Sequence, residues 1–178
     1  DITEEISYYI GRAYATKLLS LKKNKMIVGY DNRLSSPIIE KNLVKGLTDG
    51  GVDVVRLGLV TTPMYYYAWD KLNIHCGIMI TASHNPKEYN GFKMSYNGIH
   101  NCFGNEVAEL YYIILNGIYS KGNGSITDAN IKEDYIEESI LELLGDIFEY
   151  DSVVNEFFLP MIKSKLTNPK EEIEKEIK

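Results

Sequence analysis

The chain lacks several features that would assign it to a large class of proteins. No apolar run approaches the roughly 18 residues of a membrane helix, and no secretory signal is visible. Cys76 and Cys102 have neither Cys-x-x-Cys spacing nor a histidine-rich neighbourhood, so two reduced thiols in a cytosolic protein are expected. His75 and His100 are isolated and lack metal-ligand spacing. We therefore expect neither a membrane protein nor a zinc or disulfide scaffold.

A basic surface is also missing. The formal net charge is −6 and no stripe of lysine and arginine runs along the chain, which argues against a nucleic-acid partner. A phosphorylated small molecule stays possible, because a few local cations decide its binding. With 178 residues, 44% of them hydrophobic, the chain can bury one good core with an appendage.

Hydrophobic periodicity and capping residues predict alternating helices and strands. Thr3 caps a first helix, and the pairs Ser36-Pro37 and Thr62-Pro63 each place a cap before a proline at the first helical position. Gly50-Gly51 end the second helix, and the third runs to about Asp70. Apolar runs predict strands at 25–30, 52–57 and 76–80, then one at 91–96 that we expect to be antiparallel, with helices at 104–116 and 131–144.

This order predicts an α/β fold, a three-layer αβα domain with a mixed, mainly parallel sheet. The segments 31–33, 61–63 and 81–86 then follow three strands and lie at one edge of the sheet. Open α/β sheets bind their ligands at this edge, so we expect the functional site there. The tail at 151–178 departs from the pattern, and we predict a C-terminal helical segment or linker after a domain spanning 1–150.

Residues 81–86 read Thr-Ala-Ser-His-Asn-Pro directly after a buried strand. Ser83 is thus a candidate nucleophile that can carry a phosphoryl group, and His84 and Asn85 can donate hydrogen bonds beside it. A returning strand would bring Lys93 back toward the site as a general base. Arg33 has the geometry to bind two oxygens of a phosphate.

Each assignment has a plainer alternative. His84 could only orient the loop, Lys93 could be a solvated strand lysine, and Arg33 could tie Asp31 to the loop through an ion pair. An aromatic cluster after Thr62 suggests a platform for stacking sugars, but at helical spacing core packing is the better interpretation. It comprises Tyr65, Tyr66, Tyr67 and Trp69.

The segment from Thr81 to Pro86, with Asn-Gly-Phe-Lys at 90–93, resembles the active-site serine loop of the α-D-phosphohexomutases. The segments at 30–37 and 50–63 are similar to two more stretches of that family, so the resemblance covers about residues 3–145, the family's first domain. Within the family, residues 86–93 are most similar to the phosphomannomutase/phosphoglucomutase group. The resemblance implies interconversion of hexose 6- and 1-phosphates through a bisphosphate.

The same resemblance implies that Ser83 is the phosphorylated residue, that its phosphate is one ligand of Mg²⁺, and that Lys93 is the general acid/base with His84 beside it. The family's other loops are absent from these 178 residues: the Asp-Gly-Asp metal loop, the sugar loop and the phosphate clamp. We therefore expect one incomplete domain of a mutase, inactive alone, whose partners are a hexose phosphate and the remaining mutase domains.

Two other classes of function fit the sequence less well. A non-catalytic sugar-phosphate-binding or regulatory module of the same fold is the alternative, although retention of both Ser83 and Lys93 disfavours it. A serine hydrolase does not fit, because the Gly-x-Ser-x-Gly motif and a suitable acid–histidine pair are missing.

Overall fold

The computed structural model describes residues 2–98, 100–147, 156 and 159–161. The chain divides into two compact units, 1–132 and 133–178. The first unit holds the sheet and the second contains most of α5 (Lys132–Ile147). The predicted helical segment at 151–178 lies almost wholly outside the described residues, and the expected division at 150 stays a prediction.

The first unit is built on one five-stranded sheet with the order β4-β3-β1-β2-β5. Four strands are parallel, and β4 pairs antiparallel with β3 at one edge. This confirms the predicted mixed, mainly parallel sheet. The strands are β1 (Lys25–Tyr30), β2 (Asp53–Leu59), β3 (Gly77–Ile80), β4 (Phe92–Ser95) and β5 (Ile126–Asp128).

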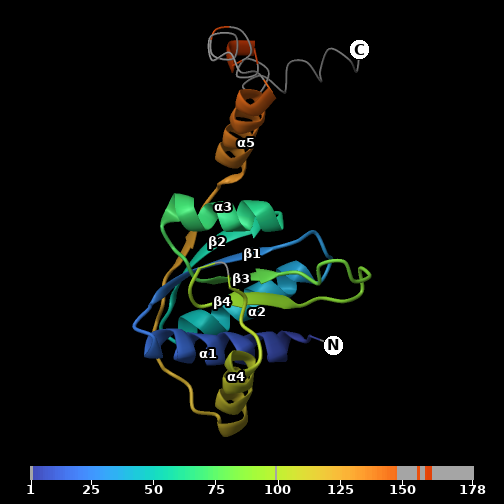
Figure 1. The fold of residues 1–178 in the computed structure, drawn as a ribbon. Coiled ribbons are helices and arrows are strands. Elements are labelled where there is room, and N and C mark those ends of the chain that lie inside the picture. Colours follow the sequence, from blue (N-terminus) through green and yellow to red (C-terminus); the bar gives the residue numbers. More distant parts are fainter. Residues whose placement is uncertain (1, 99, 148–155, 157–158, 162–178) are drawn as a thin grey trace, which may run out of the picture. The chain divides into compact units, whose positions relative to one another are not determined.

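Helices cover both faces of this sheet and complete the three layers (Figure 1). One face carries α1 (Glu4–Ser20) and α2 (Ser36–Asp49), with α4 (Asn105–Asn116) beside α1, while α3 (Thr62–Leu72) covers the other. None of the described helices combines the length and the apolar composition needed to cross a bilayer.

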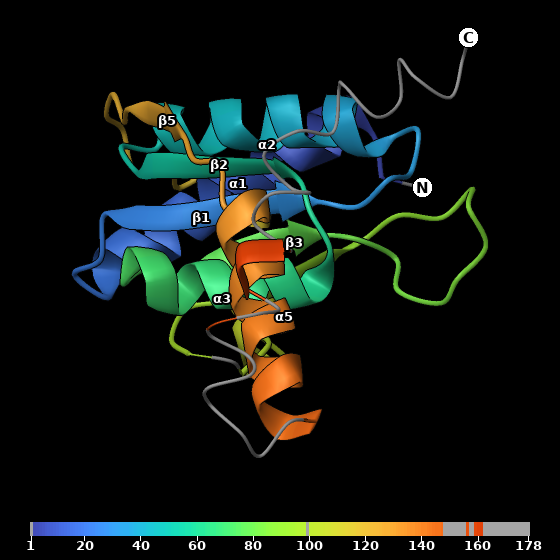
Figure 2. The same cartoon turned by 90° about the horizontal axis from the view of Figure 1, so that it is seen from above.

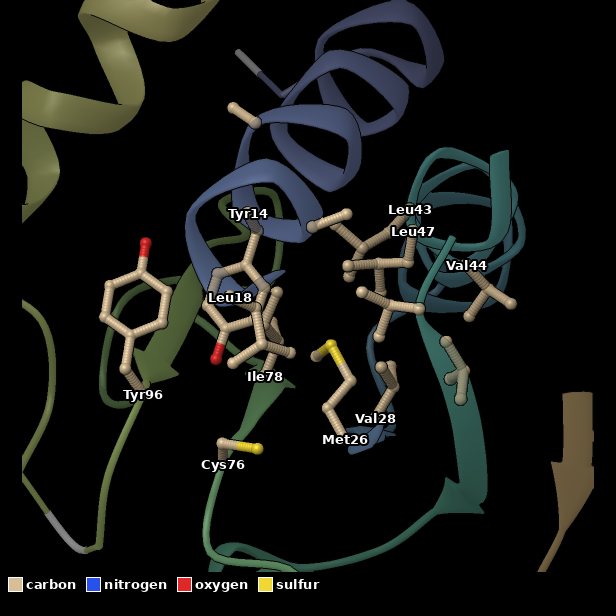
Figure 3. Close-up of a cluster of buried hydrophobic side chains, with 14 of the residues drawn as sticks. Tyr14, Leu18, Met26, Val28, Leu43, Val44, Leu47, Cys76, Ile78 and Tyr96 are labelled. Atoms are coloured by element: carbon tan, nitrogen blue, oxygen red, sulfur yellow. The ribbon is translucent and has the colours of Figure 1, made fainter. Parts of the chain in front are cut away.

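Each face of the sheet has its own apolar core. Figure 3 shows the cluster under α1 and α2, in which Tyr14 and Leu18 meet Met26 and Ile78 of the strands. Under α3 a second cluster packs Tyr65 and Trp69, each only 2% exposed, against the sheet. The core interpretation of the aromatic helix is therefore confirmed for these two residues.

Two glycines bring α1 and α2 into backbone contact. A Cβ on Gly46 would collide with the carbonyl oxygen of Tyr8, and one on Gly11 would collide with that of Leu43. The close approach is possible only because neither glycine has a side chain. It fixes α2, and with it the segment between β1 and α2, against the rest of the domain.

Two helix starts differ from the prediction by one residue. α2 is preceded by Ser35 rather than Ser36, and Ser35 forms no side-chain cap bond. The Ser36 hydroxyl donates to Asp31 at 2.9 Å. The cap of α3 is Thr61, whose hydroxyl accepts from the amide of Met64 at 3.4 Å. The short, exposed β5 was not predicted from the sequence.

Candidate active site

The segments after β1 and β3 lie side by side, and from there the chain continues to opposite sides of this pair of strands. β1 and β3 are adjacent and parallel, yet β1 leads through α2 toward β2 on one side and β3 leads to β4 on the other. Open α/β sheets bind ligands at such a switch point, beyond the carboxyl ends of the strands. Figure 2 shows the loop at 81–91 extending past the end of β3.

A cleft of about 630 Å³ lies between these two segments. One side is formed by residues 31–35, and the other by Ser83, Asn85, Lys87 and Glu88. Two of the three segments expected at this edge therefore meet, whereas 61–63 contributes none of the described residues that line the cleft. Of the three predicted loop residues, Ser83 and Asn85 line the cleft, whereas His84 is exposed but is not among the described residues that line it.

Ser83 has a backbone conformation that is unusual for a residue with a side chain. Its φ is 55°, and among the described residues only Lys22 and Asn73 are other non-glycine residues with positive φ. Its amide donates to Thr81 Oγ1 at 3.0 Å. Its hydroxyl lies 3.1 Å from Nδ1 of His84. Local strain of this kind concentrates at functional sites, which supports Ser83 as a reactive residue.

Arg33 reaches from the segment after β1 into the loop at 81–91, which is called the serine loop below. Its Nε donates to Asp31 Oδ2 at 3.0 Å, which is the ion pair considered from the sequence. Its Nη atoms donate to four carbonyl oxygens of the loop, those of Ser83, Asn85, Pro86 and Tyr89. The predicted phosphate-binding role of Arg33 and Asn85 is not tested by these contacts and stays a prediction.

Lys93 lies in β4, where its Cα is paired with that of Met79 in β3. The returning strand expected from the sequence is thus present. Cross-strand partners share one face of a sheet, so Lys93 lies on the face of Met79, which packs in the cluster under α3. The side chain is partly exposed, and its role as a general base stays a prediction.

Sequence reasoning considered the ion pair between Asp31 and Arg33 but missed the other polar contacts that hold the two segments together. The carboxylate of Asp31 accepts from the hydroxyl of Ser36 and from the amide and guanidinium of Arg33. Although burial acts to raise the pKa of Asp31, hydrogen bonds from Thr81, Ser36 and Arg33 together hold it below its ordinary value. Asn90 adds a second link, since its amide donates to both Ser35 and Ser36 at 3.0 Å.

The described residues offer no cluster of three or more histidine, cysteine or carboxylate side chains that would hold a metal ion. Mg²⁺ prefers octahedral oxygen ligands. Ser83 supplies one hydroxyl oxygen at the cleft, so the described part of this chain does not by itself fit a complete magnesium site.

The fold and the site together define an α/β domain with an exposed serine at positive φ beside a cleft at its switch point. Residues 1–117 match the family model described as phosphoglucomutase/phosphomannomutase, alpha/beta/alpha domain I. The chain belongs to this family.

Curated relatives agree with the family match. A phosphomannomutase/phosphoglucomutase of Pseudomonas syringae pv. tomato is 39% identical over 138 residues, which cover 77% of this chain and 29% of the relative. A phosphoglucomutase of Neisseria gonorrhoeae is 38% identical over 136 residues, covering 75% of this chain and 29% of the relative. The chain therefore spans about three tenths of the length of the curated relatives it matches.

A solved structure supports the fold as well. The crystal structure of a phosphoglucomutase/phosphomannomutase family protein from Burkholderia thailandensis matches with a TM-score of 0.73 and 32% identity, covering 79% of this chain and 32% of that one.

Proposed function

We propose that this chain is the phosphoserine-bearing domain of a hexose-phosphate mutase, which interconverts the 6- and 1-phosphates of mannose or glucose. Ser83 is the residue that carries the phosphoryl group. The observation that supports this most is the exposed Ser83, held at positive φ beside a cleft of about 630 Å³ at the switch point.

The reaction needs two transfers through Ser83. In the first, a sugar hydroxyl oxygen attacks the phosphorus on Ser83, so that its new P–O bond forms while the bond to Ser83 Oγ breaks. Lys93 takes the proton of that hydroxyl as general base. The resulting bisphosphate turns in the cleft, and Ser83 Oγ takes back the other phosphoryl group while Lys93 returns the proton to the departing sugar oxygen.

His84 and Asn85 assist these transfers in the proposal. His84 Nδ1 lies 3.1 Å from Ser83 Oγ, within the distance for a hydrogen bond to the hydroxyl. Asn85 lines the cleft, where its side-chain amide is available to a phosphate oxygen. Neither residue is required to hold the transferred group covalently.

Mg²⁺ belongs to the proposal through the family. Bound at the site, it would neutralise charge on the transferred phosphoryl group. One ligand would be an oxygen of the Ser83 phosphate, and the others would come from the remaining mutase domains, which are also the expected partners of this chain. Turnover would need those domains as well, so the chain alone is expected to be inactive. A cytoplasmic location is part of the same proposal, as are the hexose phosphate substrate and the absence of nucleic-acid and membrane partners.

The proposal is tested by changing the carrier and the base separately in a full-length mutase that contains this domain. Ser83→Ala removes the carrier, and we expect it to abolish the phosphoenzyme cycle. Lys93→Met leaves Ser83 able to carry phosphate and slows transfer by about 10²–10⁴-fold, the usual contribution of general acid–base catalysis. Mutase turnover and phosphoserine content by intact mass are measured for both variants.

Two substitutions control for a loss of serine or lysine elsewhere in the domain. Ser20→Ala changes an exposed serine at the end of α1, and Lys45→Met changes a lysine that is 63% exposed on α2. Both should keep normal turnover. A fully active Ser83→Ala enzyme would refute the mutase proposal, while a phosphorylated but inactive full-length protein would favour the regulatory module.

A further inference from the structure

The guanidinium of Arg33 is enclosed by the serine loop. Its side chain is only 9% exposed, although the loop itself lies at the surface. Arginine has five N–H donors, and here Nε binds Asp31 while each Nη atom binds two carbonyl oxygens. The four bonds to carbonyls measure 2.6 to 3.0 Å. All five donors are therefore engaged within the protein.

Asp31 fixes the position of this cation. Besides the guanidinium, it accepts the backbone amide of Arg33 at 3.2 Å and the hydroxyl of Ser36 at 2.9 Å. Its own amide donates to the carbonyl of Ile80, the last residue of β3, at 3.0 Å. The amide of Asp31 thus joins the end of β1 to β3, the strand that precedes the serine loop, while its carboxylate aims Arg33 at the loop carbonyls.

Arg33 also acts on the strained conformation of Ser83. A residue with a Cβ in the left-handed region is disfavoured, so contacts on both sides must hold it there. On the amide side, Ser83 donates to Thr81 Oγ1. On the carbonyl side, Ser83 and Asn85 both accept from the same Nη2 of Arg33, at 3.0 and 2.9 Å. Arg33 therefore spans the turn in which the serine lies.

We propose that Arg33 is a positioning residue for Ser83 and not a ligand of the substrate phosphate. This inference rests on the proposed function of Ser83 as the phosphoryl carrier. A phosphate oxygen would bind Arg33 only by displacing a loop carbonyl, which would then lose its partner and release the turn. The cation at the side of the cleft instead binds the loop carbonyls and so holds Ser83 in position at the cleft.

The substitution Arg33→Lys distinguishes a phosphate-binding role of Arg33 from a positioning role. A lysine at this position keeps the charge and can bind a phosphate as a point charge, but its three donors on one nitrogen cannot reach four carbonyls and Asp31 together. A phosphate ligand would therefore be partly rescued by Arg33→Lys, whereas a positioning residue would not. Arg56→Lys is the matched control, because Arg56 also forms an ion pair with a buried carboxylate, Glu40, away from the serine loop.

The first measurement is amide hydrogen exchange in the 178-residue chain. The amides of Asn85 and Tyr89 donate within the loop, to Ala82 and Pro86, and report its order directly. We expect Arg33→Lys and Arg33→Met to speed the exchange of these two loop amides by at least about tenfold and to leave the exchange of the β1 amides unchanged. In the control variant Arg56→Lys, the two loop amides should exchange as in the unaltered chain. Loop protection in Arg33→Lys equal to that of the unaltered chain would overturn the proposal.

The second measurement separates kcat from KM in the full-length mutase. Positioning predicts that Arg33→Lys lowers kcat as much as Arg33→Met does, with KM for the hexose phosphate within about threefold of normal. A raised KM with unchanged kcat would identify a phosphate ligand and refute the inference. If Ser83→Ala were fully active, the mutase proposal would fail, yet the exchange result would still decide whether Arg33 orders the loop.

Discussion

The positive φ of Ser83 gives a prediction about stability that needs no enzyme assay. Ser83→Gly and Ser83→Ala both remove the hydroxyl and its contact with His84, but only glycine relieves the left-handed strain. That strain is worth about 1–2 kcal/mol for a residue with a Cβ, and the greater freedom of glycine in the unfolded chain offsets about 0.4–1 kcal/mol. We therefore expect the glycine variant to be more stable than the alanine variant by about 0.5–1 kcal/mol.

The assay is urea unfolding of the 178-residue chain, because the difference appears as a shift in the midpoint at constant slope. The contacts that hold the turn are made by the backbone of Ser83 and are kept in both variants. Lys22, exposed with φ of 59°, provides the matched pair Lys22→Gly and Lys22→Ala. If glycine is more stabilising than alanine at position 22 but not at position 83, the strain assigned to Ser83 is refuted.

Three further outcomes follow from the described contacts. The lowered pKa of Asp31 means that its contribution is present above the unfolded pKa of about 3.9 and is lost as pH falls through the folded pKa. Asp31→Asn should thus destabilise the chain by about 1–3 kcal/mol at pH 7 and by less at pH 3, measured by urea unfolding; an equal loss at both values would contradict this. Gly46→Ala should lower the free energy of unfolding by about 1–3 kcal/mol, because the added Cβ meets the carbonyl of Tyr8. A thermal unfolding midpoint equal to that of the unaltered chain would show that α1 and α2 lie further apart. Calorimetric titration of the unphosphorylated chain with Mg²⁺ should find no micromolar site, and finding one would reveal ligands beyond Ser83.

Much of the fold could be predicted because it depends on local patterns. The strand at 25–30 was predicted with its observed bounds, and the strands at 52–57 and 76–80 differ by one or two residues at their ends. Buried parallel strands leave continuous apolar runs, and helix caps leave serine, threonine and proline at fixed positions. In contrast, β5 is three exposed residues long, and such a strand leaves no apolar signal.

The candidate site was predictable only as far as its motif extends. Ser83, His84 and Asn85 are adjacent in the sequence, and the structure places the Ser83 hydroxyl beside the His84 ring. The ion pair of Arg33 with Asp31 was among the alternatives considered, but its four loop partners were not predictable, because they are backbone carbonyls, which every residue has. Which of them face a distant guanidinium depends on the path of a loop, and no pattern of residue types records that path.

The reach of Arg33 across the sequence also affects when the loop forms. Its carbonyl partners lie 50 to 56 residues further along the chain, in the loop that follows β3, the strand that pairs parallel with β1. Parallel pairing requires the whole intervening crossover, so this contact forms late compared with the helices. During synthesis on the ribosome, the guanidinium stays in water until the chain beyond Tyr89 has emerged. Ser83 acquires its geometry only after that step, so a nascent chain does not yet present the serine in its final orientation.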